Sequence, residues 1–90
     1  MEGQKLIDQF HKNSIELVEV NLTEWKAQEY IDIRIYYLPD PVNEKDRLPT
    51  KKGVCLNIEH LPRLIQALQK AQKLLKKMHE SAQDKSLEQG

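Results

Sequence analysis

The most regular hydrophobic pattern of the chain lies in residues 30–37, Tyr-Ile-Asp-Ile-Arg-Ile-Tyr-Tyr. The three isoleucines share one parity, and the other parity holds Tyr30, Asp32, Arg34 and Tyr36. Alternation with a period of two in β-branched and aromatic residues predicts a half-buried strand. Tyr37 has the parity of the isoleucines, so its position in the pattern favours the core, while its place at the strand end leaves it available for binding.

A second strand is predicted in residues 14–22, where the alternation changes phase. Apolar residues have odd numbers up to Leu17 and even numbers from Val18 onward. One extra residue in a strand turns every later side chain to the opposite face, so this change predicts a bulge near Leu17 and Val18. The polar stretch 23–29 is predicted to connect this strand to the next one.

Residues 38–50 contain three of the four prolines of the chain, which predicts a loop. The short apolar run Val54-Cys55-Leu56 follows and predicts a third strand, in which Cys55 is expected to be a small core hydrophobe. Asn57 then has the side chain of a helix N-cap.

A long amphipathic helix is predicted from Ile58 to Met78. Its apolar positions recur at spacings of three and four and form a seam of about two and a half heptads, with basic side chains on the opposite face. Pro62 removes a helical hydrogen bond beyond the first turn, which places the helix start near Glu59 or His60. Strands followed by one helix predict an α+β fold, with the helix on one face of an antiparallel sheet.

The two ends of the chain are more polar than its middle. Residues 1–13 are predicted to be a loosely attached arm containing at most one or two helical turns. Residues 79–90 are predicted to be a flexible tail. The expected single domain therefore comprises residues 14–78.

A chain of 90 residues with five aromatic side chains has little material for a core. Such a chain buries only roughly 60% of its unfolded surface, and small cores are usually reinforced by disulfides, a metal or a partner chain. The single cysteine excludes an internal disulfide, and the histidines form no metal-ligand motif. We therefore expect a homodimer whose interface is the helical seam, with contacts from Leu61, Leu64, Leu68, Ala71 and Leu75.

The charges are distributed unevenly, although the chain has no formal net charge. Residues 45–78 hold nine basic side chains against two acidic ones, while residues 1–44 and 79–90 are acidic overall. This asymmetry indicates a local polyanion-binding patch. For the helical lysines considered alone, a solvated face is the simpler interpretation.

Several function classes are excluded by what the sequence lacks. It has no phosphate-cradling glycine loop and no nucleophile motif, so we expect no enzyme, no cofactor, no metal and no small-molecule substrate. It has no apolar run of the roughly 18 residues that a membrane span needs, and its first residues do not resemble a signal peptide. The expected location is the cytoplasm, in association with the nucleoid if the source is bacterial.

Four segments together resemble the positive cofactor four family, which consists of transcriptional coactivators with a single-stranded-DNA-binding domain. These segments are Trp25-Lys26, Ile31-Asp-Ile-Arg-Ile-Tyr-Tyr37, Asp40-Pro41 and Lys51-Lys-Gly-Val-Cys-Leu-Asn57. The resemblance covers about residues 14–75 and points to a stand-alone member of bacterial type. It implies a curved antiparallel sheet of about four strands, one C-terminal helix, and a dimer whose helices pack across a two-fold axis.

The resemblance also implies a binding site for single-stranded nucleic acid. The predicted site comprises Trp25, Lys26, Arg34, Tyr36, Tyr37, Lys51, Lys52 and Gly53. Aromatic rings would stack on bases, and basic side chains would neutralise phosphates, so that binding depends little on base sequence and strongly on salt. Gly53 would let the backbone approach the bound strand closely.

The predicted function is sequence-tolerant binding of single-stranded DNA by a homodimer, as a coactivator-like protein or an accessory protein of DNA metabolism. Two alternatives remain open at this stage. One is a protein-interaction module of the same fold, in which the lysines only confer solubility. The other is an RNA chaperone, because stacking and phosphate neutralisation do not exclude ribose.

Overall fold

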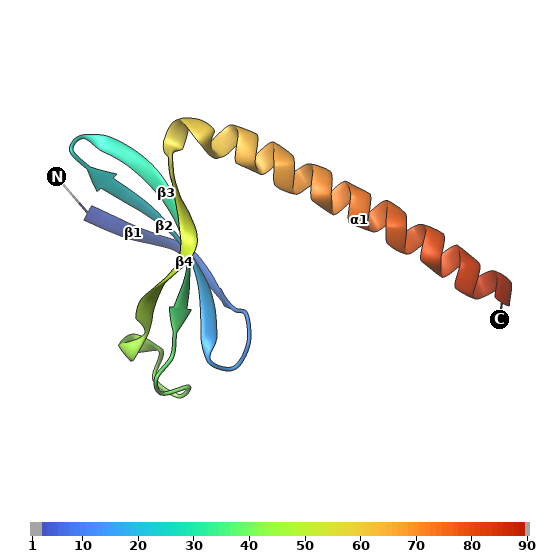
Figure 1. Cartoon of the computed structure of the whole chain (residues 1–90), viewed down its shortest axis with the longest axis horizontal. Coiled ribbons are helices and arrows are strands. Elements are labelled where there is room, and N and C mark those ends of the chain that lie inside the picture. The colour runs from blue at the N-terminus through green and yellow to red at the C-terminus, as the bar shows by residue number, and fades with distance from the viewer. Residues whose placement is uncertain (1–2, 90) are drawn as a thin grey trace. The chain divides into compact units, whose positions relative to one another are not determined.

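The computed structural model describes residues 3–89, and their side chains as far as residue 80. Four strands form one antiparallel sheet in chain order: β1 (Gly3–His11), β2 (Glu16–Trp25), β3 (Gln28–Tyr37) and β4 (Leu48–Asn57). A 3-10 turn, Ile58–His60, precedes the helix α1 (Leu61–Gln89) (Figure 1). The chain divides into two compact units, a sheet that ends at Glu59 and a helix from His60 onward. The predicted α+β class and the order of its elements are confirmed.

The pairing of β2 with β3 defines the two faces of the sheet. It runs without interruption from Glu16 opposite Tyr37 to Trp25 opposite Gln28. We call the side that carries Glu19 and Arg34 the polar face. Its members on β2 and β3 are Leu17, Glu19, Asn21, Thr23, Trp25, Gln28, Tyr30, Asp32, Arg34 and Tyr36. The apolar face carries Val18, Val20, Leu22, Ile31, Ile33 and Ile35. The predicted bulge at Leu17 was wrong, because Leu17 is a buried apolar residue on the polar face.

The first strand lies where the sequence predicted a loose, partly helical arm, so that prediction was wrong. β1 pairs with β2 along its whole length, from Gly3 opposite Glu24 to His11 opposite Leu17. The register shifts between Leu6 and Asp8, which leaves Ile7 as an extra residue. This bulge breaks the alternation of β1, and the apolar residues on either side of it then have the spacing of a helix.

The connection between β2 and β3 is a two-residue turn rather than the predicted stretch 23–29. Lys26 and Ala27, its two residues, have φ of 52° and 61°. Positive φ at both central positions is the geometry of a type I′ hairpin turn, which matches the twist of the two strands. Both strands therefore extend further toward the tip than the polar sequence indicated.

The last strand, β4, is longer than the predicted strand 54–56 and includes Pro49. It is an edge strand of the sheet, where a residue without an N–H is tolerated. Its pairing with β3 shifts between Arg34 and Tyr36, so that residues 50–52 bulge opposite a single residue. The loop before it contains a short 3-10 helix, Glu44–Asp46.

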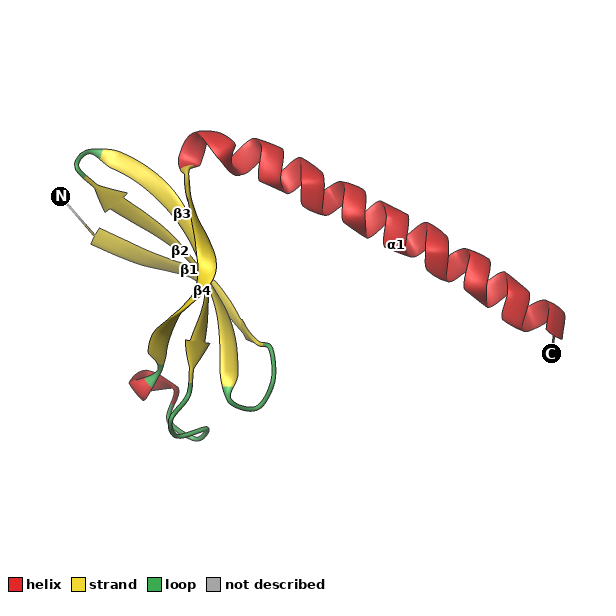
Figure 2. Cartoon of the chain, viewed as in Figure 1, coloured by secondary structure: helices red, strands yellow, loops and turns green. Residues whose placement is uncertain are grey.

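The core of this chain is small. Among the described residues, the buried hydrophobic side chains are Leu17, Ile31 and Leu38. The other five residues of the apolar face are only half-buried, whereas Glu19 and Asn21 on the polar face are almost completely buried. The strands are strongly twisted (Figure 2). The sheet alone therefore leaves much of its apolar face accessible.

Helix α1 begins at Leu61, one or two residues after the start near Glu59 or His60 that Pro62 predicted, and Pro62 lies in its first turn, where proline is tolerated. Asn57 caps the preceding 3-10 turn, because its Oδ1 accepts the N–H of Glu59 at 3.0 Å. The flexible tail in residues 79–90 stays a prediction, but the helix continues past its predicted end at Met78 as far as Gln89. The reason lies in the sequence, which has no proline or glycine between Pro62 and Gly90.

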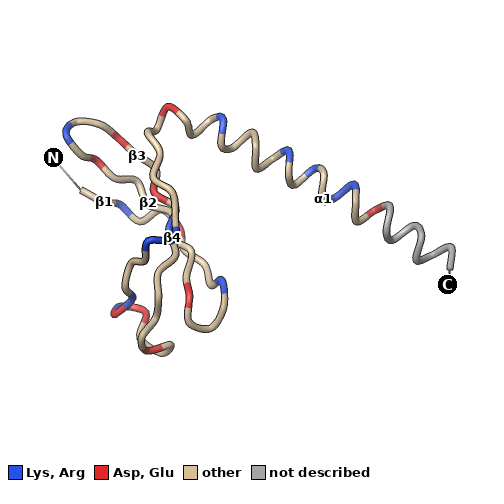
Figure 3. The backbone as a smooth tube through the Cα atoms, viewed as in Figure 1, with Lys and Arg blue, Asp and Glu red and all other residues tan. Residues whose placement is uncertain are grey.

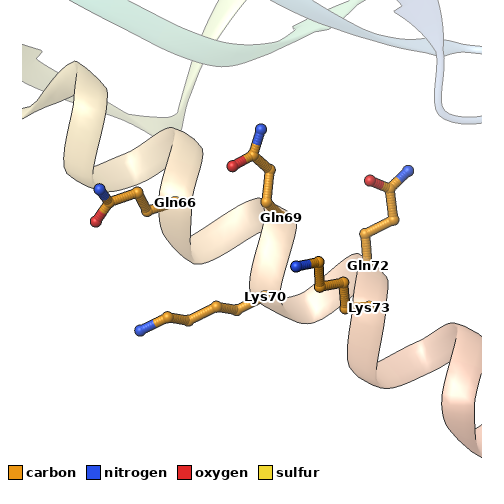
Figure 4. Close-up of a pocket in the computed structure, with 5 residues that line it drawn as sticks. All are labelled: Gln66, Gln69, Lys70, Gln72 and Lys73. Carbon is orange, nitrogen blue, oxygen red and sulfur yellow. The ribbon is translucent and has the colours of Figure 1, made fainter.

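The described part of the helix carries two adjoining shallow grooves. Ile65, Leu68, Ala71 and Leu75 line a mainly apolar one, and Gln69 and Gln72 line its border with the other. A second shallow groove is lined by Gln66, Gln69, Lys70, Gln72 and Lys73, whose side chains project outward from the helix (Figure 4). Basic residues recur along α1 from its first turn, and the first acidic residue in the helix is Glu80 (Figure 3).

Candidate nucleic-acid interface

The tip of the β2–β3 hairpin presents an aromatic ring beside a cation. Trp25, the last residue of β2, is 53% exposed. The Nζ atom of Lys26 lies 4.4 Å from the centroid of the Trp25 ring. The negative face of an aromatic ring attracts an ammonium group, and the turn brings Lys26 over its neighbour. An exposed indole beside a positive charge can stack on a base and contact its phosphate.

An open pocket adjoins this ring on the polar face. Thr23, Trp25, Tyr30 and Cys55 line it, and its volume is about 350 Å³. Cys55 is exposed, so its predicted place in the core was wrong. The register explains this result, because Cys55 lies opposite Asp32 on the polar face instead of among the isoleucines.

Arg34 lies in the middle of the polar face, and all three of its guanidinium nitrogens donate hydrogen bonds to β3 or β4. Its Nε and Nη2 donate to the two carboxylate oxygens of Asp32 at 3.1 and 2.8 Å, and its Nη1 donates to the carbonyl oxygen of Thr50 at 3.0 Å. The hydrogen bonds to Asp32 raise the pKa of Arg34 above its ordinary value. Arg34 therefore fastens the bulge of β4 to β3, and its charge is balanced within the sheet.

A second arginine, which sequence reasoning missed, covers another part of the polar face. The Nε of Arg47 donates to the buried carboxylate of Glu19, and its Nη1 donates to the carbonyl oxygen of Glu44 at 3.3 Å. Its Cζ lies 5.7 Å from the centroid of the Tyr36 ring. A signal was present in the sequence, because Glu19 is a charge in the parity of Leu17 and a buried carboxylate needs a partner.

The predicted aromatic residues at the end of β3 lie on different faces. Tyr36 belongs to the polar face, where its hydroxyl accepts a hydrogen bond from Gln4 Nε2 at 3.5 Å. Tyr37 has the alternation of the apolar face and is 42% exposed, so it is not a core residue. The structure therefore places Trp25, Arg34 and Tyr36 on one side of the sheet and Tyr37 on the other.

The basic pair of β4, Lys51 and Lys52, is exposed, and hydrogen bonds of the neighbouring Thr50 hold this part of the strand in place. Thr50 Oγ1 donates to the carbonyl oxygen of Ile35 at 2.7 Å and accepts the N–H of Lys52 at 3.2 Å. Within the described residues, neither Lys51 nor Lys52 forms an ion pair. These two ammonium groups are therefore available to phosphates, unlike the guanidinium groups of the polar face.

The close packing of β4 against β3 explains why residue 53 is a glycine. A Cβ atom at this position would lie 2.5 Å from the carbonyl oxygen of Ile33 and 2.8 Å from the Cα of Arg34. Such distances are too short for non-bonded atoms, so the β3 backbone itself requires glycine here. The predicted reason, a close approach of the nucleic acid, is not needed to explain the residue.

A charged cluster lies at the start of β2. The carboxylate of Glu16 accepts hydrogen bonds from Asn13 Nδ2 at 2.7 Å and from Lys12 Nζ at 3.4 Å. The hydrogen bond from Asn13 is the main cause that lowers the pKa of Glu16, and the charges of Lys12 and Lys52 act in the same direction. The positive charge of Lys52 therefore acts on the carboxylate of Glu16, although Lys52 forms no ion pair among the described residues.

The predicted dimer residues lie along α1 with different exposure. Leu61 and Leu64 are half-buried, whereas Leu68, Ala71 and Leu75 are exposed. Among the described residues, no three metal-ligating side chains gather into a site. No described helix is long and apolar enough to cross a membrane.

Comparison with known proteins places these features in a family. Residues 12–67 match the sequence profile of Transcriptional Coactivator p15 (PC4). No curated protein matches the chain significantly in sequence.

Two solved proteins share the fold. A PC4 homologue from Burkholderia pseudomallei K96243 has 23% identity over 78% of this chain. Its tetragonal and orthorhombic crystal forms give TM-scores of 0.67 and 0.68 and are covered over 98% and 90% of their chains. The bacteriophage T5 homologue of the eukaryotic coactivator PC4, implicated in recombination-dependent DNA replication, gives a TM-score of 0.59 with 16% identity over 99% of this chain and 97% of its own. The profile match spans more than half of the chain and agrees with the fold, so this protein belongs to the PC4 family of transcriptional coactivators.

Proposed function

We propose that the protein binds single-stranded DNA as a homodimer, with little sequence preference, and acts as a coactivator-like or DNA-metabolism accessory protein. The observation that carries this proposal is the exposed Trp25 ring with the Lys26 ammonium beside it, on the sheet of a PC4-family fold. An isolated exposed tryptophan has little structural purpose at a hairpin tip, whereas a stacking platform requires this exposure.

The energetic basis is stacking combined with phosphate neutralisation. Each base that stacks on an aromatic side chain contributes roughly 1–3 kcal/mol, and every base has a π face, so the contact is tolerant of sequence. Lys26, Lys51 and Lys52 supply charges that are not balanced by an ion pair within the described residues. Their contacts with phosphates release counterions, so the affinity falls as salt increases.

The homodimer is supported by apolar surface that the single chain leaves open. Leu68, Leu74, Leu75 and Met78 on α1 are all more than half exposed. Contiguous exposed apolar surface of this kind marks an interaction site. A second copy of the chain offers the same seam and would bury it symmetrically.

The proposal is tested by fluorescence anisotropy of a labelled oligo-dT strand, with competition by unlabelled single-stranded DNA, duplex DNA and RNA of matched length. We expect saturable binding at about 50 mM salt, clearly weaker binding at about 200 mM salt, and poor competition by duplex. Equal competition by RNA would favour the RNA chaperone. Absence of binding at low salt would favour the protein-interaction module.

A further inference from the structure

We propose that the pocket lined by Thr23, Trp25, Tyr30 and Cys55 receives one unpaired base of the bound single strand, and that this base covers the Cys55 thiol. The inference rests on the proposed function and assigns a base-binding role to Tyr30 and Cys55, which sequence reasoning did not include in the site. The reactivity of Cys55, the only cysteine of the chain, would then report whether a base occupies the pocket.

Three adjacent strands build this pocket through their register. Thr23 on β2 lies opposite Tyr30 on β3, and Tyr30 lies opposite Asn57 on β4. Cys55 is two residues from Asn57 and therefore on the same face, diagonal to Tyr30, within reach of a long side chain. Trp25 is two residues from Thr23, so the two aromatic residues occupy neighbouring positions along one face.

The size and lining of the pocket suit a base. Its volume of about 350 Å³ lies within the range of about 300–1,000 Å³ that small-molecule sites occupy. Two of its four lining residues are aromatic, and the polar groups of the other two are one hydroxyl and one thiol. Contact through ring faces with few hydrogen-bonding groups distinguishes bases weakly, which agrees with tolerant binding.

The surrounding charges favour a nucleotide over an aromatic side chain of another protein. The Lys26 ammonium lies over the Trp25 ring, 4.4 Å from its centroid, where it can meet the phosphate of a nucleotide held in the pocket. Asp32, which lies opposite Cys55 on the polar face, is neutralised by its ion pair with Arg34. Glu24 and Glu29, the two carboxylates at the tip of the hairpin, lie opposite each other at positions of the other parity. They therefore belong to the far face of the sheet.

The position of Cys55 provides a direct test by alkylation. Its thiolate sulfur displaces iodide from iodoacetamide and forms a carbon–sulfur bond, while the thiol proton goes to solvent. The thiol is exposed in the free protein, so the reaction is open to solvent there. A base in the pocket would block the reagent, and an alkylated thiol would in turn obstruct the base.

The experiment follows the alkylation rate of the full chain by intact mass, with and without oligo-dT, while anisotropy reports saturation in the same samples. The proposal predicts that a saturating single strand slows alkylation at least about five-fold. This factor matches the free energy that one stacked base contributes to binding. Matched duplex should leave the rate unchanged. A saturated complex with an unchanged rate would overturn this inference alone, whereas no anisotropy change would overturn the proposed function as well.

Substitutions test the pocket without relying on the thiol reaction. Tyr30→Leu keeps an apolar side chain but removes a ring, and it should weaken oligo-dT binding about ten-fold. Phe10→Leu is the matched control, because it removes an exposed ring from β1, and it should bind as the unaltered protein does. Cys55→Ser should retain binding, and Cys55→Trp should fill the pocket and weaken binding. Full binding by both Tyr30→Leu and Cys55→Trp would overturn the proposal.

Discussion

At the scale of single residues, the arginines and the lysines of the sheet use their charges in different ways. Arg34 is bound to Asp32 and to the carbonyl oxygen of Thr50, and Arg47 is bound to the buried Glu19. These arginines hold β4 and the preceding loop in place. The lysines of β4 carry no such partner among the described residues, so they are the groups that phosphates can recruit.

Gly53→Ala is expected to destabilise the sheet, because its Cβ would lie 2.5 Å from the carbonyl oxygen of Ile33. Overpacking of this kind typically costs about 1–3 kcal/mol. Urea denaturation should therefore show a lower unfolding midpoint. Lys52→Ala, at the exposed neighbouring position, is the control and should leave the midpoint almost unchanged. Equal midpoints for Gly53→Ala and the unaltered chain would contradict the close approach of the two strands.

Glu16 is expected to contribute to acid sensitivity. Its pKa in the folded protein is lowered from 4.5, mainly by the hydrogen bond from Asn13. A lowered folded pKa means that this carboxylate stabilises the fold above about pH 4.5 and loses that contribution as the pH falls through the lower folded value. The difference in unfolding midpoint between the unaltered chain and Glu16→Gln should be largest near neutral pH and shrink in acid.

A double-mutant cycle separates the hydrogen bond from the other causes. In an Asn13→Ala background, Glu16→Gln should change the midpoint less than in the unaltered chain, since the main donor is already gone. An effect of Glu16→Gln that does not change with pH, or that is the same in both backgrounds, would refute the assigned cause.

At the scale of elements, the success of sequence-based prediction depended on unbroken alternation. β3 was predicted closely, because its isoleucines alternate with polar residues from end to end. β1 was missed, because the extra residue Ile7 disrupts its period and leaves a pattern that resembles a helix. The long β4 was only partly predicted, since a proline and a bulge interrupt it.

The residues of the candidate site were predicted largely from a resemblance to a family, whereas the side-chain partners of these residues were not predicted. Trp25 and Lys26 lie together as expected. The engagement of Arg34 depends on the bulge of β4, and the exposure of Cys55 depends on register. Register is set by pairing between strands that are distant in sequence, so a local pattern does not reveal it.

The basic pair of β4 is expected to determine part of the salt dependence. For single strands, each neutralised phosphate adds about 0.7 to the slope of log affinity against log salt. Lys51→Ala combined with Lys52→Ala should therefore weaken oligo-dT binding and reduce the slope by up to about 1.4. Anisotropy titrations at several salt concentrations measure this slope. Lys45→Ala, in the loop before β4, is a single-charge control, and a slope unaltered by the double substitution would place the phosphate path elsewhere.

At the scale of the whole molecule, the described side chains leave more apolar surface open than a stable small domain usually tolerates. Among the described residues, three hydrophobic side chains are buried, while fourteen large ones are exposed, five of them on α1. The described part of the chain has one cysteine, which is free, and no cluster of metal-ligating side chains. Neither a disulfide nor a metal can therefore reinforce the core there. This open surface supports the proposed homodimer, in which a second copy of the chain would bury it.

Leu68→Asp is expected to disrupt the homodimer, because it places a charge in the middle of the exposed seam of α1. Light scattering at micromolar concentration should show the mass of two chains for the unaltered protein and of one chain for the variant. Binding of oligo-dT should weaken in parallel. Gln66→Asp is the matched control, since it adds the same charge in the polar groove of the helix, and it should remain dimeric. A dimeric Leu68→Asp would show that the seam is not the interface.

Single-strand binding through Trp25 is tested most directly by the intrinsic fluorescence of this single tryptophan. Oligo-dT is titrated into the protein at low and high salt, beside a matched duplex. Stacking on the exposed indole predicts saturable quenching by the single strand, weaker quenching by the duplex, and a shift to higher concentrations as salt increases. Unchanged fluorescence at low salt, in samples where the oligonucleotide is shown by anisotropy to be free, would contradict the account.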